Sequence, residues 1–473
     1  MAVSLDMLSL LPDPLLIIII SLLPFKEAIR TSVFSKSWCN NKLFKLTTNI
    51  EFNELFFVKS YQPSIKHLQR KAFLDFITFW IDNNKESIIE KFSLKLSMPN
   101  NVSELTEKCI AFATHKGGVK HLELDFSDPK WVEYNNVAPY HKFHEPMFAL
   151  PKHVYDELKG IQILKLYSCR FVEKDLLNFH ALKEVSFGWM EVSIFLINSL
   201  ISNCKMLESL SLKRCWNFSE FYLRDRNQKL KKLVVDNCSF QYELFRVVAP
   251  NLKFFKYSGM MSYFDIKGCP QVEVADLDFS TEFGFGGKGY RLYNFMEDFY
   301  SLKVLTVCSY FLQVIPHGSD MLRMERNFNI RHLTIKTQLN KSDYRGIVFM
   351  LRSCPMLQCL TIQLGCARIW PNYAQPFASA PKNFWTENVR IYECLKSSLE
   401  VLEVKGFQGF DKSEIRMLAY FIQSGKVLKK MTINMEKDII LSCNRNLDLN
   451  PRKFAEFLLK VPRASTDLEI TIC

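Results

Sequence analysis

The sequence has little glycine and proline, no closely spaced cysteine pairs and no long apolar run. Its 473 residues include 16 glycines and 18 prolines, while 48% are hydrophobic, which excludes collagen-like, low-complexity and wholly disordered chains. None of the 14 cysteines has CxxC spacing, so we expect reduced and mostly buried thiols. The apolar run at residues 15–23 is far shorter than the roughly 18–20 residues that span a bilayer. We therefore expect no secretory signal, no membrane partner, and a location in the nucleus or cytoplasm.

The chain also has only a small excess of positive over negative charge. The chain has 61 Lys and Arg against 49 Asp and Glu, a net charge of +12. Proteins dedicated to nucleic acids concentrate such a surplus on one face, because clustered cations provide most of the affinity for phosphates. A modest surplus spread over a long chain predicts no nucleic-acid partner.

What recurs is the pattern apolar-x-x-apolar-x-apolar. Clear copies begin at Leu207, Leu230, Leu302, Ile330, Leu357 and Leu399, and weaker copies begin at Ile89, Val119, Ile161, Leu182, Leu252, Val272 and Leu428. Successive copies start 20 to 30 residues apart, except for two gaps of 42, and leucine-rich repeats have a period of roughly 20–29 residues. The pattern predicts an α/β fold, a curved leucine-rich-repeat solenoid with a wall of parallel strands.

Six cysteines occupy fixed places in this repeat. Three follow the last apolar position by three residues, and three precede the first by three; they are Cys169, Cys215, Cys238, Cys204, Cys269 and Cys354. The turn of a leucine-rich repeat buries a small side chain at the former position. We interpret all six as structural and not as metal ligands or nucleophiles.

The x positions predict the chemistry of the open face of the wall, because alternate residues of a strand point to opposite faces. Lysines alternate there with acidic residues, and hydroxyls follow in the C-terminal part. A face without a continuous basic stripe suits a protein partner, although loops on the rim are an alternative contact. The candidate substrate-binding residues are Lys213, Lys232, Lys256, Asp276, Asp278, Thr306, Thr334 and Thr361.

The first forty residues lack the repeat. Asp13 as N-cap and Pro14 at the first helical position predict a helix that ends before Pro24. A second helix is expected over residues 26–33 and a third over residues 35–38. So small a segment cannot bury all its large apolar side chains, so an apolar face should remain. Two interpretations stay open: the face binds a partner, or it packs on the first repeats as an N-terminal cap.

This segment resembles an F-box of the plant form between Leu11 and Trp38. The shared stretches are Leu11-Pro12-Asp13, the Leu23-Pro24 before Lys26-Glu27-Ala28, Thr31-Ser32-Val33, and Ser35-Lys36-x-Trp38. The sequence departs from the family at Pro14, where an acidic residue is usual, at Phe25, where a capping Thr or Ser is usual, and at Ser37 and Cys39, where Arg is common. Pro14 is harmless in a first turn, whereas a lost cap would cost the second helix about 0.5–2 kcal/mol.

The C-terminal part resembles the FBD domain, a module of plant F-box proteins with leucine-rich repeats. The resemblance lies in residues 392–400, 406–409, 414, 418–421, 427–433 and 459–465. Helices are expected near residues 414–423 and 452–459, closing the end of the solenoid. The predicted domains are an F-box over 1–48, a leucine-rich-repeat solenoid over 49–385, and an FBD domain over 386–473 that continues the repeat stack.

These resemblances imply a substrate-recognition subunit of an SCF-type (Skp–cullin–F-box) ubiquitin ligase. Such a chain is not an enzyme and needs no cofactor; its F-box binds a Skp-type adaptor and through it a cullin, and its repeats bind a protein substrate. The expected adaptor contacts are apolar residues, some of which must form the small internal core: Leu11, Pro12, Leu15, Leu16, Ile19, Leu23, Val33 and Trp38. The departures from the family leave a second hypothesis, a ligase-independent protein-binding scaffold with a degenerate F-box.

No motif predicts a catalytic or metal site. The glycine-rich residues 284–289 lack the Ser or Thr that follows the lysine of a phosphate-binding loop, so we expect a flexible loop of a repeat. His141 and His144 lack the i, i+4 spacing of a zinc protease. A small-molecule sensor would need a closed pocket, which open strands do not predict. Residues 73–82 are too apolar for an exposed helix and are expected to pack between the F-box and the repeats.

Overall fold

The computed structural model contains two compact units, each described here by itself. The first comprises Met1–Phe218 with Asp225–Leu230, and the second comprises Ser219–Arg224 with Lys231–Cys473. The structure describes residues 11–33, 47–60, 62–85, 88–115, 118–128, 147–176, 179–282, 284, 286–316, 323–365, 380–381, 383–387, 390–409, 412–435 and 451–473.

The first unit begins with the short helices α1 (Asp13–Leu22) and α2 (Phe25–Arg30) and the 3₁₀ turn η1 (Thr31–Val33). Pro12 is the N-cap of α1, so the helix begins one residue before the predicted start and Pro14 lies in its first turn, where a missing N–H breaks no helical bond. The predicted second helix divides into α2 and η1. The predicted third helix, residues 35–38, lies outside the described residues.

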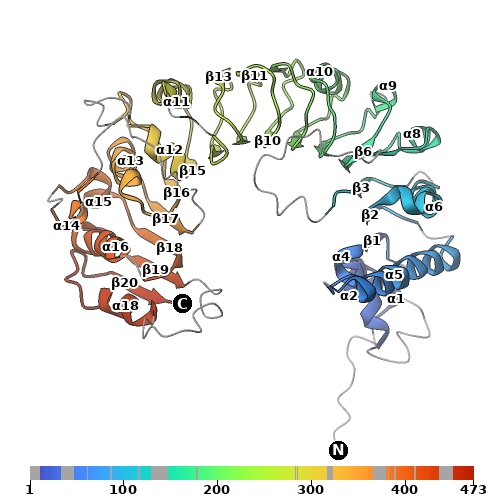
Figure 1. Cartoon of the computed structure of the whole chain (residues 1–473), viewed down its shortest axis with the longest axis horizontal. Coiled ribbons are helices and arrows are strands. Elements are labelled where there is room, and N and C mark those ends of the chain that lie inside the picture. The colour runs from blue at the N-terminus through green and yellow to red at the C-terminus, as the bar shows by residue number, and fades with distance from the viewer. Residues whose placement is uncertain are drawn as a thin grey trace, which may run out of the picture. The chain divides into compact units, whose positions relative to one another are not determined.

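The rest of the first unit alternates strands with helices (Figure 1). Its parallel strands have the order β1-β2-β3-β5-β7-β8. The elements are β1 (Asn49–Asn53), α4 (Glu54–Phe57), α5 (Pro63–Asn83), β2 (Lys91–Lys95), η3 (Pro99–Val102), α6 (Ser103–Thr114), β3 (His121–Asp125), β4 (Phe148–Ala149), α8 (His153–Glu157), β5 (Ile163–Tyr167), β6 (Cys169–Arg170), α9 (Glu173–Leu176), β7 (Glu184–Gly188), α10 (Ile194–Asn203) and β8 (Ser209–Lys213).

The second unit continues the parallel pattern in the order β10-β12-β14-β15-β16-β17-β18-β19-β20. A small parallel sheet, β13-β11-β9, stands where other repeats have helices (Figure 1). The elements are β9 (Phe221–Arg224), β10 (Lys232–Asp236), β11 (Leu244–Val248), β12 (Phe254–Ser258), β13 (Tyr263–Gly268), β14 (Val274–Asp278), α11 (Lys288–Glu297), β15 (Val304–Cys308), α12 (Ser309–Val314), β16 (His332–Thr337), α13 (Lys341–Ser353), β17 (Cys359–Leu364), α14 (Phe384–Glu387), α15 (Glu393–Ser397), β18 (Val401–Phe407), α16 (Lys412–Ser424), β19 (Lys430–Met435), α18 (Pro451–Leu458) and β20 (Glu469–Ile472).

Each of the thirteen predicted repeats supplies one strand of these parallel sheets, and its apolar positions are buried. Two further strands, β1 and β20, extend the ladders. Strand pairing places Thr47 and Asp467 where the repeat has its first apolar residue, which is why the apolar pattern missed both strands. Helices α16 and α18 confirm the two expected C-terminal helices, and β18 to β20 continue the strand ladder.

The repeat cysteines are structural, as predicted. Five of the six are buried and Cys238 is half-buried, and all six are free thiols. Burial raises the pKa of Cys204 to about 11 and that of Cys269 to about 12, so both thiols stay protonated at neutral pH.

Candidate functional site

The first α-helix separates its apolar side chains onto two faces. Leu16 and Ile20 are buried and form a small core with Ala28, against which Leu11 and Leu23 pack. Leu15, Ile18 and Leu22 are 47%, 57% and 81% exposed. Because residues at i, i+3 and i+7 share one side of a helix, these three form one stripe, which we call the α1 stripe.

The helices α1 and α2 pack on the first strand and on α5 of the same unit. Phe25 is buried, and its ring centroid lies 5.7 Å from that of Phe52 on β1 and 4.9 Å from that of Trp80 on α5, both edge-on. The Asn49 side-chain amide donates a 2.6 Å hydrogen bond to the Ser21 carbonyl. Residues 73–82 therefore lie at the junction, as predicted. Phe25 is covered there, while the α1 stripe stays exposed.

Phe25 is not a helix cap. Pro24 occupies the N-cap position of α2 without a side-chain hydrogen bond, and Phe25 is the first helical residue. The expected loss of a cap at residue 25 was therefore wrong. The aromatic side chain instead fills the space between β1 and α5.

The expected adaptor contacts that the structure describes fall into three groups by their exposure. Pro12, Leu15 and Val33 are exposed, whereas Leu11, Ile19 and Leu23 are half-buried. Leu16 is buried in the internal core, so it is not part of the open face. Trp38 lies outside the described residues.

Sequence reasoning missed Ile18 and Leu22, which belong to the α1 stripe. The signal was available, since both follow Leu15 at helical spacing. A run of isoleucines with no polar residue concealed which side of the helix faces water.

The open face of the second unit is arranged in rows across the strands. In the first row, defined here as the apolar row, neighbouring strands pair Phe254, Val274, Val304, His332, Cys359 and Val401. In the second, the polar row, they pair Lys256, Asp276, Thr306, Thr334, Thr361 and Glu403. All members of the apolar row are half-buried except the exposed His332. The face therefore offers apolar contact and hydroxyl groups side by side.

The charged side chains of this face neutralise one another. Lys256 Nζ lies 2.8 Å from Asp276 Oδ2, and Lys336 Nζ lies 3.5 Å from Asp276 Oδ1 and 3.8 Å from an oxygen of Asp278. Partial burial by itself would lower the pKa of Lys256, but the hydrogen bond and charge of Asp276 outweigh it and raise that pKa. On β12, β14 and β16 the alternating signs read from the sequence are thus internal ion pairs, which reduce the charge available to attract a polyanion.

The structure brings most of the candidate substrate-binding residues together. Lys256, Asp276, Asp278 and the three threonines lie on one face of β12 and β14 to β17. Lys232, at the start of β10, is exposed, with its Nζ 5.5 Å from the ring centroid of Phe254. Lys213 lies on β8 of the first unit. The apolar row could not be recognised from charges and hydroxyls, because the second x position of most of these repeats carries neither.

The open face of the first unit has the same kind of charge pairing. Lys95 Nζ lies 3.1 Å from Glu123, and Lys165 Nζ lies 3.3 Å from Glu184. His121 stands on β3 among them, and burial, together with the charges of Lys91 and Lys165, lowers its pKa to about 4. This histidine is neutral at physiological pH.

Among the glycine-rich residues, Gly284, Gly286 and Gly287 lie in a loop, as predicted, whereas Lys288 and Gly289 begin α11. Specific hydrogen bonds hold this loop. Gly287 has a φ of 67° and caps α11, and Tyr310 donates a 2.6 Å hydrogen bond to the Gly284 carbonyl. Lys288 Nζ lies 3.3 Å from Glu282, where it neutralises a buried carboxylate.

Among the residues that the structure describes, no group of three or more His, Cys, Asp or Glu side chains is placed to hold a metal ion, and no helix is both long and apolar enough to cross a membrane. His141 and His144 lie outside the described residues.

Comparison with known proteins covers nearly the whole chain. A family model described as "At1g61320/AtMIF1, LRR domain" matches residues 114–469, and the F-box domain model matches residues 8–40. The chain is 32% identical over 435 residues to F-box protein At3g62230 of Arabidopsis thaliana, covering 91% of each chain. It is 32% identical over 431 residues to the putative F-box/LRR-repeat protein At1g56400 of the same plant, covering 89% of this chain and 87% of the relative. It is also 24% identical over 485 residues to the Arabidopsis putative F-box/FBD/LRR-repeat protein At2g05300. Together with the F-box segment and the ladder of repeat strands, these matches show that the chain belongs to the plant F-box/leucine-rich-repeat protein family.

Proposed function

We propose that this protein is the substrate-recognition subunit of an SCF-type ubiquitin ligase. Its F-box would bind a Skp-type adaptor, and through it a cullin, while its repeats bind a protein substrate. The chain itself would form no covalent bond. It would act by proximity, because holding a substrate lysine near the ubiquitin carrier raises its effective concentration.

The α1 stripe carries this proposal. Leu15, Ile18 and Leu22 lie side by side in water within the segment that matches the F-box. Burying a large aliphatic side chain contributes about 1.5–3 kcal/mol, so a partner that covered all three would gain substantially. Such a stripe on the side of α1 opposite its buried core fits an adaptor surface.

The open face of the second unit supports the substrate half of the proposal. Ion pairs neutralise part of its charge, and its apolar and polar rows together offer packing and hydrogen bonds. Protein interfaces combine these two kinds of contact. We place the protein in the nucleus or cytoplasm, which its free, buried thiols favour, and the FBD identity of residues 386–473 stays a prediction.

The test is binding of the full chain to a panel of plant Skp-type adaptors by calorimetry. The double variant Ile18→Ser/Leu22→Ser should bind at least about 10²-fold more weakly, because two apolar contacts are lost. Phe195→Ser is the matched control, since Phe195 is 76% exposed on α10 of the same unit, and it should bind like the unmodified chain.

Two outcomes would count against the proposal. Equal affinity of the double variant and the unmodified chain would show that the α1 stripe is not part of the adaptor interface. Failure of the unmodified chain to bind any adaptor in the panel would favour the ligase-independent scaffold.

A further inference from the structure

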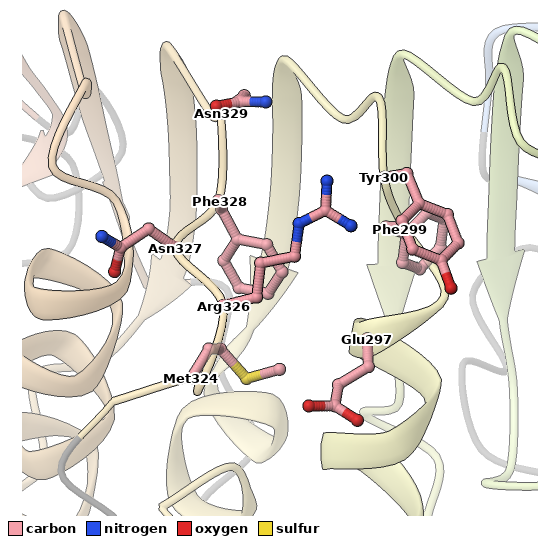
Figure 2. Close-up of a pocket in the computed structure, with 8 residues that line it drawn as sticks. All are labelled: Glu297, Phe299, Tyr300, Met324, Arg326, Asn327, Phe328 and Asn329. Carbon is pink, nitrogen blue, oxygen red and sulfur yellow. The ribbon is translucent and has the colours of Figure 1, made fainter.

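A pocket in the second unit lies apart from the open face of its strands. It is formed where the end of α11 meets the segment of residues 323–329 that leads into β16 (Figure 2). Its floor is apolar and buried, consisting of Phe299, Met324 and Phe328. The pocket has a volume of about 200 Å³ and is partly open to solvent, so the structure has a hollow that the open strands did not predict.

The segment that carries the pocket is held in place by hydrogen bonds. The Met324 N–H donates to Ser353 Oγ at 2.9 Å, and the Phe328 N–H donates to the Ser353 carbonyl at 2.8 Å. The Glu325 N–H donates to the Tyr293 hydroxyl at 2.9 Å. These anchors on α11 and α13 mean that the pocket is formed before any ligand binds, which reduces the ordering cost of binding.

Arg326 provides the positive charge of the pocket, and Glu297 contributes a negative charge to its lining. Its guanidinium carbon lies 4.9 Å from the ring centroid of Tyr300, and Figure 2 shows the side chain between Phe328 and Tyr300. Among the described residues Arg326 has no hydrogen bond or ion pair, and Glu297, which also lines the pocket, is not within ion-pair distance of it. A stacked guanidinium keeps the N–H groups in its plane available, and their fork matches a carboxylate.

We propose that this pocket binds a carboxylate attached to a compact apolar group. The apolar part would rest on the buried floor, and the carboxylate would accept hydrogen bonds from Arg326. The size fits, because a cavity of about 150 Å³ already accommodates a benzene ring, whereas drug-sized ligands need about 300 Å³ or more. The ligand is therefore either a small aryl or alkyl acid, or an apolar side chain of a peptide beside an acidic one.

The experiment compares matched probes on the full chain by saturation-transfer NMR titration. The acid probe is 3-phenylpropionate and its neutral counterpart is 3-phenylpropionamide. We expect the acid to bind about tenfold more tightly than the amide, the factor that one charge-assisted hydrogen bond provides. The peptide arm uses Ac-Phe-Asp-NH2 against Ac-Phe-Asn-NH2.

Two variants test whether the preference for the acid over the amide arises in the pocket. Arg326→Gln should abolish this preference. Arg323→Gln should keep it, because Arg323 is an exposed arginine of the same segment that does not line the pocket. Both positions are exposed, so both variants should unfold at the same temperature as the unmodified chain. Binding of the acid alone supports a small-molecule ligand, and binding of the Asp peptide supports a peptide ligand. Equal binding of acid and amide in both arms, or a preference that survives Arg326→Gln, would overturn the proposal.

Discussion

Replacing Phe25 by Thr would restore the residue that the family usually has at this position, yet we expect it to destabilise the protein. Two effects compete. A new helix cap would contribute about 0.5–2 kcal/mol, whereas removing a buried phenyl ring costs about 3–5 kcal/mol. The structure decides between them, because Pro24 holds the N-cap position and Phe25 packs edge-on against Phe52 and Trp80.

The expected net loss is about 2–4 kcal/mol, since Thr at the first helical position gains little as a cap. Local opening of α1 and α2 should become easier by this amount, so their backbone amides should exchange with deuterium about 30-fold to 10³-fold faster. Hydrogen-exchange mass spectrometry of peptides that cover residues 13–30 measures this directly.

The matched control is Val33→Thr, an apolar-to-Thr change at a side chain that is 84% exposed. It should alter stability by no more than about 0.5 kcal/mol. Unchanged or slower exchange in Phe25→Thr would refute the reasoning, because it would mean that residue 25 acts as a cap and that its ring contributes little to the junction.

Three further predictions concern the repeats. Gly346→Ala should destabilise the second unit by about 1–3 kcal/mol or more in urea unfolding, because the new Cβ would fall 2.0 Å from the Leu312 carbonyl oxygen and force α13 away from α12. Asp343 is fully buried and accepts hydrogen bonds from three side chains, so Asp343→Ala should cost more than Asp343→Asn, which keeps one acceptor; equal losses would contradict this. The pKa of His121 is lowered to about 4 in the folded chain, so the unfolded chain binds more protons between pH 4 and about pH 6.5. The free energy of unfolding therefore decreases as the pH is lowered through this range. Relative to His121→Gln, the unmodified protein should lose about 1 kcal/mol between pH 7 and pH 5, roughly half of what the full shift would give, because water screens the partly exposed ring; urea unfolding at both pH values measures this.

The repeat strands could be predicted because each one buries its own apolar positions, which leaves a local signal in the sequence. The end strands β1 and β20 escaped because Thr47 and Asp467 break that signal. The strands β9, β11 and β13 were also not predicted, since the repeat pattern does not indicate whether a strand or a helix covers the back of a repeat.

Contacts between distant segments could not be predicted in the same way. The burial of Phe25 depends on Trp80, and the pocket around Arg326 depends on Tyr300 of the preceding repeat. Neither contact has a spacing that a single sequence reveals. For α1, by contrast, helical spacing groups Leu15, Ile18 and Leu22 on one face, although an all-apolar run does not reveal that this face is the exposed one.

The adaptor and scaffold hypotheses differ in what they require of the F-box segment. Phe25 first counted as a departure that weakens this segment, but its ring packs at the junction with the first repeats, so this departure is no sign of decay. The departures at Ser37 and Cys39 lie outside the described residues. An F-box without an adaptor would gain nothing from keeping Leu15, Ile18 and Leu22 in water, where apolar patches promote non-specific association. The open α1 stripe beside a well-packed core therefore favours an F-box that still has a partner to cover it.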